Sequence, residues 1–284
     1  MIPAAFEYHR PGDVDAAIAL LQTHGDEARV LAGGHSLIPM MKLRMAAVEH
    51  LIDLQDVTAL QGIQIASDTV TIGAMTTQHD LIADDGLAKV APIIREAALQ
   101  IADPQVRYMG TIGGNVANGD PGNDMPGLMQ CVDAVFTLVG PDGTREVKAR
   151  EFFEAAYMTA RDDEEILTQI RFPTHAGGYA YEKQKRKIGD YATAAAAVLL
   201  TRDGGMCNAA SVAMTNLSDV PVFSENASAA LVGSACDAGA VKAAVDAMLE
   251  DIDPSEDNRG PVEFKRHVAG VILGHAIARA WSRA

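Results

Sequence analysis

The sequence predicts an α+β fold divided into more than one domain. With 284 residues, 48% of them hydrophobic, the chain is long enough to build two separate cores. A helical pattern near the start is followed by short strand patterns that run into a glycine pair. Two later regions alternate apolar and polar residues as β-hairpins do, and helical patterns close the chain. Helices and strands therefore both contribute to the fold.

The first 56 residues predict a helix and two strands. Asp13 is a typical N-cap for a helix that would end at Gly25. Residues 28–34 (ARVLAGG) predict a strand that leads into the glycine pair, and residues 50–54 (HLIDL) predict a second strand. A short helical or irregular segment is expected between them.

The middle of the chain predicts antiparallel strands beside helices. Residues 62–74 have the pattern of a β-hairpin, and residues 81–103 have helical spacing interrupted by Pro92. Strand patterns follow at 131–140, 144–149 and 164–173. The segment PTHAGG after these strands indicates a domain boundary, which we place after residue 176.

The last third predicts a smaller α+β domain with a short antiparallel sheet and helices. Residues 179–187 alternate as a strand, and residues 198–217 predict two strands about Gly204 and Gly205. Two helices separated by residues 251–261 are expected to follow. The run 193–198 (TAAAAV) is compatible with helix or strand, because alanine favours helices while its neighbours favour strands.

Composition restricts the classes of function. The formal net charge of −15 argues against nucleic acid as a partner, and the one basic cluster, KQKRK at 183–187, is short. No apolar run reaches the length of a membrane span, and the first residues lack a secretory pattern, so the default expectation is a cytoplasmic protein. Three scattered cysteines suggest neither a disulfide framework nor a metal cluster.

Two glycine pairs are the most informative motifs. LAGGHS at 31–36 and TIGGN at 111–115 could each turn sharply and leave backbone amides free to bind an anion. Ser36, Thr111 and Asn115 would add polar groups, so that both turns could share one pyrophosphate. The alternative is that each pair is only a tight structural turn.

Better-known phosphate sites fit poorly. Asp53 stands twenty residues beyond Gly33, as the ribose-binding acid does in a Rossmann unit, but GGHS lacks the third glycine of that fingerprint. Neither turn continues into a P-loop. His35 is expected to be a local hydrogen-bonding group rather than a catalyst. The sequence offers no catalytic triad, zinc-protease motif or paired carboxylates, and we predict neither catalytic residues nor metal ligands.

Three further residues are candidates for contacts with a flat cofactor. Asp124, in the loop GDPGND, could accept a hydrogen bond from a sugar or ribityl hydroxyl, or could serve turn chemistry alone. Lys185 could approach a phosphate or ring, and Tyr191 could cover a flat ring. A solvated basic face is the simpler account of the lysines.

The motifs AGGHS (32–36), TIGGN (111–115) and KRKIGDYATA (185–194) resemble the FAD-binding subunits of molybdenum hydroxylases, the family that includes xanthine dehydrogenase. The resemblance covers the whole chain and is nearest to the branch of aerobic carbon monoxide dehydrogenases. It implies a two-subdomain FAD-binding domain of the vanillyl-alcohol-oxidase/PCMH type at 1–176, divided near residue 56, and a C-terminal flavoprotein domain at 177–284.

The resemblance also implies a cofactor, a set of contacts and partners. FAD would be bound by a set of residues from both motifs and their surroundings: Ala32, Gly33, Gly34, His35, Ser36, Leu37, Ile101, Ala102, Thr111, Gly113, Gly114, Asn115, Asp124, Leu167, Lys185 and Tyr191. An iron–sulfur small subunit would supply electrons, a molybdopterin large subunit would oxidise the substrate, and a quinone could be the acceptor. A dimer of heterotrimers is implied, in the cytoplasm or peripherally at the inner face of the cytoplasmic membrane.

Three other functions stay open at this point. The same subunit could serve a hydroxylase that acts on a purine, an aldehyde or an N-heterocycle, because the large subunit chooses the substrate. The chain could be a flavin-free assembly subunit, although both glycine motifs are intact. A stand-alone nicotinamide dehydrogenase is disfavoured by the missing Rossmann fingerprint.

Overall fold

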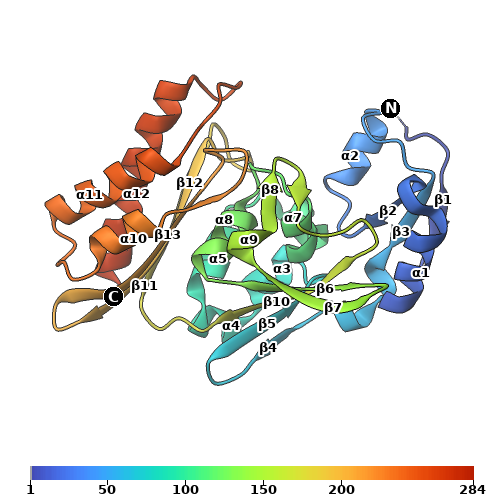
Figure 1. Cartoon of the computed structure of the whole chain (residues 1–284), viewed down its shortest axis with the longest axis horizontal. Helices are drawn as coiled ribbons and strands as arrows, with labels where there is room; N and C mark the ends of the chain where they lie inside the picture. Colours follow the sequence, from blue (N-terminus) through green and yellow to red (C-terminus); the bar gives the residue numbers. More distant parts are fainter. Residues whose placement is uncertain (1) are drawn as a thin grey trace.

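The computed structural model describes residues 2–284, in which three sheets follow one another along the longest axis of the molecule (Figure 1). The N-terminal lobe lies at one end, the C-terminal sheet and its helices lie at the other, and a five-stranded sheet lies between them. Helices and sheets both contribute, which confirms the α+β prediction. None of the helices in the described range combines the length and apolar character needed to cross a bilayer.

The N-terminal lobe is built on a three-stranded parallel sheet in the order β1-β3-β2. Its elements are β1 (Glu7–His9), α1 (Val14–His24), β2 (Ala28–Leu31), α2 (Leu37–Lys42) and β3 (His50–Asp53). The Asp13 side chain accepts a hydrogen bond from the backbone N of Ala16 at 2.8 Å, and Gly25 ends the helix at φ 49°. The predicted helix and both predicted strands of this lobe are confirmed.

The middle sheet is antiparallel, with the order β4-β5-β10-β6-β7. Its strands are β4 (Ile63–Ile65), β5 (Thr69–Gly73), β6 (Val135–Gly140), β7 (Gly143–Lys148) and β10 (Ile166–Pro173), with β8 (Phe153–Ala155) and β9 (Met158–Thr159) as a separate pair. The helices here are α3 (Gln78–Ala83), α4 (Asp85–Val90), α5 (Pro92–Ala98), α6 (Pro104–Met109), α7 (Ile112–Ala117), α8 (Asp124–Cys131) and α9 (Ala149–Phe152). The predicted hairpin is confirmed, and Pro92 is the first residue of α5.

One segment of the middle region differs from its prediction. The sequence predicts a strand at residues 131–134, but Cys131 ends α8 and the strand β6 begins only at Val135. All eight residues of α8 are buried, so tertiary packing maintains a helix that Pro126 and Gly127 obscure in the sequence.

The C-terminal region pairs a four-stranded antiparallel sheet with three helices. The strands are β11 (Gly178–Gln184), β12 (Ala194–Asp203), β13 (Met206–Thr215) and β14 (Val222–Phe223), and the helices are α10 (Glu225–Leu231), α11 (Ala238–Asp251) and α12 (Val262–Ser282). The expectation of two helices was incomplete, because α10 precedes them. The ambiguous alanine run is a strand, since β12 covers it.

Burial on both faces explains this alanine-rich strand. Ala195, Ala197 and Leu199 pack in the core shared with the middle sheet, whereas the alternate residues Ala196 and Val198 pack against the C-terminal helices. A strand covered on both faces contains a continuous apolar run, because neither set of alternating side chains meets water.

Candidate cofactor-binding site

The first glycine pair forms the turn between β2 and α2. Gly34 has φ 74°, a backbone conformation that glycine adopts without strain. Among the described residues, none accepts a hydrogen bond from the five successive backbone N–H groups of Gly33 to Leu37. Each of these five residues is at least partly exposed. The turn therefore presents a row of free donors that suits an anionic group.

The second glycine pair differs from the expected turn with free amides. Gly113 and Gly114 lie in the first turn of α7, where the Oγ1 of Thr111 accepts a hydrogen bond from the N of Gly114 at 3.0 Å. The N of Gly113 donates to the O of Ala74 at 2.8 Å. A Cβ at Gly113 would lie only 2.4 Å from the Cβ of Ala74. This pair therefore permits close packing and does not supply free donors.

The two motifs lie against each other, although about eighty residues separate them in the chain. A Cβ added at Gly33 would lie 2.1 Å from the O of Met109, just before the second motif. A Cβ added at Gly114 would lie 3.2 Å from the Cβ of Ala32. Only residues without a side chain allow this approach, which explains the glycines on both sides.

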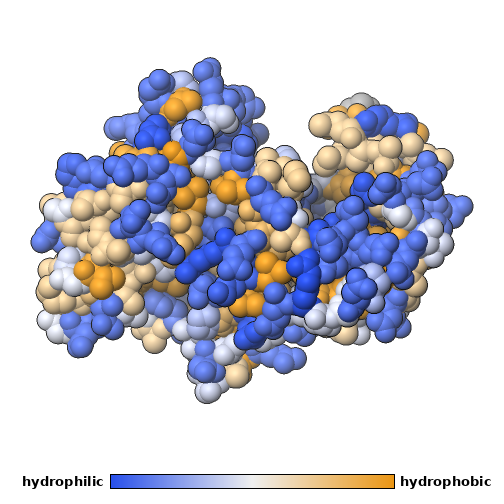
Figure 2. Space-filling view, viewed as in Figure 1, coloured by the Kyte–Doolittle hydropathy of each residue, from blue (hydrophilic) through white to orange (hydrophobic). Residues whose placement is uncertain are grey.

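A cavity of about 340 Å³ opens beside the first turn. The space-filling view is hollowed between the lobe that carries α2 and the middle of the molecule (Figure 2). The lining residues come from the turn and α2, from the loop after α7, and from loops of the middle and C-terminal regions: His35, Ser36, Pro39, Met40, Asn118, Asp120, Gly122, Tyr157, Tyr191, Asn216 and Arg259. Its volume is at the lower end of the range for small-molecule sites.

Two tyrosines and one ion pair set the polarity of this cavity. Burial, and next the nearby Asp120 carboxylate, raise the pKa of Tyr157 and the pKa of Tyr191, so both phenols stay neutral. The guanidinium of Arg259 lies 5.7 Å from the ring centroid of Tyr191 and pairs with Asp257 at 3.2 Å. The wall thus offers a flat aromatic surface with a cation beside it.

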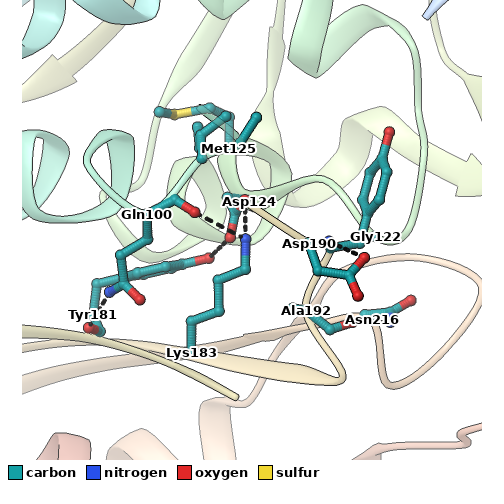
Figure 3. Close-up of polar contacts among 12 residues, drawn as sticks. Gln100, Gly122, Asp124, Met125, Tyr181, Lys183, Asp190, Ala192 and Asn216 are labelled. Atoms are coloured by element: carbon teal, nitrogen blue, oxygen red, sulfur yellow. Dashed lines mark hydrogen bonds and ion pairs between the residues drawn. The ribbon is translucent and has the colours of Figure 1, made fainter. Parts of the chain in front are cut away.

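Asp124 lies in a buried ion pair rather than at the cavity (Figure 3). Its Oδ2 is 2.8 Å from the Nζ of Lys183, and its Oδ1 accepts a hydrogen bond from the Tyr181 hydroxyl at 2.5 Å. Burial raises the pKa of Asp124, against the opposing effects of Lys183 and Tyr181. Each oxygen of Asp124 thus already has one protein partner, and the predicted contact with a cofactor hydroxyl would need a further lone pair of this carboxylate.

The other predicted site residues take several positions. His35, Ser36 and Tyr191 line the cavity. Asn115 lies in α7 outside the lining of the cavity, and its Oδ1 accepts a hydrogen bond from the N of Met125 at 3.2 Å and so helps to position α8.

Four residues predicted to contact the cofactor lie outside the lining of the cavity. Ile101 and Ala102 form the loop before α6, and Ala102 adopts φ 42°. Leu167 is buried in the core within β10. Lys185 follows the end of β11, away from the lining of the cavity, and burial, with the neighbouring charge of Lys183, lowers its pKa.

Several lining residues were not identified from the sequence. Asn118 and Asp120 lie beside and within the loop GDPGND, from which the sequence predicts only Asp124 as a ligand contact. Tyr157, at φ 62°, and Arg259 come from loops that carry no recognisable motif. The positive φ of Tyr157 is unusual for a bulky residue, but it is visible only in the structure.

Comparisons with known proteins agree with this geometry. Residues 4–175 match the family described as "FAD binding domain in molybdopterin dehydrogenase", and residues 179–280 match the "CO dehydrogenase flavoprotein C-terminal domain". The carbon monoxide dehydrogenase medium chain of Afipia carboxidovorans is 56% identical over 287 residues, covering 100% of this chain and 99% of the relative. That of Hydrogenophaga pseudoflava is 46% identical over 285 residues, with coverage of 100% and 99%. A chain of the reconstituted CO dehydrogenase from Oligotropha carboxidovorans superposes with a TM-score of 0.99 at 56% identity, covering 100% of both chains.

Proposed function

The chain belongs to the FAD-binding family of molybdopterin dehydrogenases, and on that premise we propose that it is the FAD-carrying electron-transfer subunit of a carbon monoxide dehydrogenase. Two relatives that match it over 99% of their length are named as medium chains of that enzyme. The family membership accounts for both parts of the chain.

The row of free amides from Gly33 to Leu37 is the observation that carries the assignment to this site. FAD has a pyrophosphate whose oxygens accept hydrogen bonds from such donors. Ser36 adds a hydroxyl at the same turn, and the Thr111 hydroxyl, which accepts from Gly114, keeps its own proton available to donate. The chain therefore fits a diphosphate at the place where its two glycine motifs meet.

The remaining cavity wall suits the flat end of the cofactor. Tyr191 offers an aromatic surface that is 43% exposed, so a planar ring can stack on it. Arg259 beside it would favour negative charge on a ring. The residues of the chain would thus bind and orient the cofactor, and Pro39 and Met40 would exclude water from one side.

Bound FAD would supply the redox chemistry, because it can accept electrons one at a time and release them in pairs. We propose that the electrons come from an iron–sulfur small subunit that serves a molybdopterin large subunit, and that they leave to an external acceptor such as a quinone. The sequence boundary near residue 176 would separate the FAD-binding domain, with subdomains divided near residue 56, from the C-terminal domain. A dimer of heterotrimers would be the working assembly.

The visible absorption spectrum of the purified chain, alone and with its two partner subunits, tests the cofactor assignment. We expect a flavin spectrum with near-stoichiometric FAD, identified by chromatography after denaturation. A chain without flavin in both samples would refute the assignment. Reduction of an artificial dye by the complex with carbon monoxide, compared with xanthine, tests the substrate separately, and a preference for xanthine would leave the flavin role intact while removing carbon monoxide as the substrate.

A further inference from the structure

Three histidines from three elements meet at one edge of the N-terminal lobe. His9 ends β1, His24 ends α1, and His50 begins β3. One ring nitrogen from each lies within 4.8 Å of the others. His9 Nε2 is 3.1 Å from His50 Nδ1, and the rings of His24 and His50 stack with their centroids 3.6 Å apart. Residues distant in the sequence thus converge on one point.

This cluster is separate from the cavity described above. His50 pairs with Ala28 at the first residue of β2, whereas the glycine turn follows Leu31 at the last. Three residue steps along a strand span roughly 10 Å. His50 therefore places the cluster toward the opposite end of the same small sheet, and His9, whose backbone pairs with Ile52, reaches it through its side chain.

We propose that His9, His24 and His50 bind one Zn²⁺ ion or a similar divalent transition metal ion. Zinc binds imidazole nitrogens at about 2.0–2.1 Å, so two nitrogens of a tetrahedral site are about 3.3–3.4 Å apart. The His9–His50 separation of 3.1 Å is already close to this spacing. The third nitrogen lies within 4.8 Å, and the ring of His24 would leave its stack on His50 and turn about its side-chain torsions to direct this nitrogen at the ion.

A fourth ligand and a path for entry are both available. The Oε2 of Glu7 lies 3.6 Å from His50 Nδ1, and this side chain is 74% exposed, so it can rotate toward an ion. Water could take the same position. All three histidines are partly exposed, which lets a hydrated ion reach them. The net charge of −15 also favours the approach of a cation.

The metal would act as a structural clip for the lobe that carries the first glycine turn. It would join β1, α1 and β3, which are otherwise connected by strand pairing and a small core. An ion that binds the folded lobe and not the unfolded chain stabilises the folded state.

Titration of the full-length chain, first freed of metal by chelation, tests this site. ZnCl₂ binding would be measured by isothermal titration calorimetry, and CoCl₂ would report the ligand geometry by visible absorption. We expect one ion per chain, with intense tetrahedral cobalt bands. His24→Gln and His9→Gln should each weaken zinc binding at least tenfold and abolish those bands. His267→Gln, which replaces an exposed histidine on α12, is the matched control.

Circular dichroism of each variant without metal checks that it folds, and the two ligand variants together keep the test informative if one of them fails to fold. Zinc should raise the melting temperature of the wild type and the control but not that of His24→Gln or His9→Gln. Equal zinc affinity in the wild type and a folded ligand variant would overturn the proposal, as would binding without a saturable stoichiometry of one.

Discussion

Replacement of Gly33 by alanine tests whether contact between the two glycine motifs builds the FAD site. A Cβ here would lie 2.1 Å from the O of Met109 and 2.7 Å from the Cα of Gly110. Ordinary Cβ contacts begin at 3.4 Å, so the difference between 3.4 and 2.1 Å, about 1.3 Å, is the separation that the substitution demands. Both neighbours are backbone atoms, so the two segments themselves must move apart.

We expect Gly33→Ala to lower the free energy of unfolding by about 1–3 kcal/mol, the usual cost of forced overpacking. The affinity for FAD should fall at least tenfold, because a displacement of about 1 Å changes the geometry of several donors at once. The ratio of FAD to protein after gel filtration, a fluorescence titration with FAD and urea unfolding would measure these effects.

Gly12→Ala is the control, since a Cβ at Gly12 meets no atom within 4 Å. It should keep the FAD affinity and unfolding midpoint of the wild type. If Gly33→Ala also retained stoichiometric FAD with an unchanged dissociation constant, the idea that contact between the two glycine motifs builds the FAD site would be refuted.

Three other predictions concern ionisable groups at buried or half-buried positions. Lys183→Met leaves the Asp124 carboxylate buried without its cation and should lower the free energy of unfolding, measured in urea, by about 3–5 kcal/mol. Partial recovery of stability on adding Asp124→Asn would assign the loss to this ion pair. A loss below about 1 kcal/mol would contradict the reasoning. Burial raises the pKa of Glu165, but the hydrogen bonds from Arg145 and from the backbone N of Asp162, together with the nearby guanidinium charges, outweigh burial and leave this pKa below its usual value. These contacts therefore stabilise the fold above about pH 4.3, and the stabilisation disappears as the pH falls through the lower folded-state pKa. Arg145→Met, at a half-exposed position, should lower the free energy of unfolding by roughly 1 kcal/mol at pH 7 and make that free energy depend less on pH in the acid range. An unchanged pH dependence in this range would argue against the role of the Arg145–Glu165 pair. Burial raises the pKa of Cys131 to about 12, so this thiol stays protonated and unreactive at about pH 8.5. Cys131→Ala should therefore not change the number of thiols that a disulfide reagent labels in the native chain at this pH. One labelled thiol fewer in the variant would contradict this prediction.

Elements with local signals were predictable from the sequence. The helix after Asp13 has its own cap and stop, and the hairpin at 62–74 has alternation and a turn. The helix α8 lacks such signals, because Pro126 and Gly127 interrupt it and its stability comes from burial on all sides. Tertiary packing of this kind leaves no periodic pattern in the sequence.

The alternation of side chains along β11 explains why Lys183, and not the predicted Lys185, binds Asp124. Tyr181 and Lys183 are two residues apart in β11, so their side chains leave the strand on the same face, and both reach Asp124. Lys185 continues this alternation but lies beyond the end of the strand. Sequence alone identified the basic segment, but the strand end decides which lysine is buried.

The spacing between Gly33 and Asp53 shows why a motif needs its structural context. Twenty residues separate them, as in a Rossmann unit, yet Asp53 Oδ2 accepts a hydrogen bond from Tyr8 at 2.6 Å and Oδ1 accepts one from the N of Gln55 at 2.9 Å. With both oxygens engaged and only 5% of the residue exposed, Asp53 joins β1 to β3 within the lobe. A ligand at the first turn therefore gains no ribose contact from this acid, and part of its other contacts must come from outside the lobe. The second glycine motif, packed against the first, and the loops of the middle and C-terminal regions are in position to supply them.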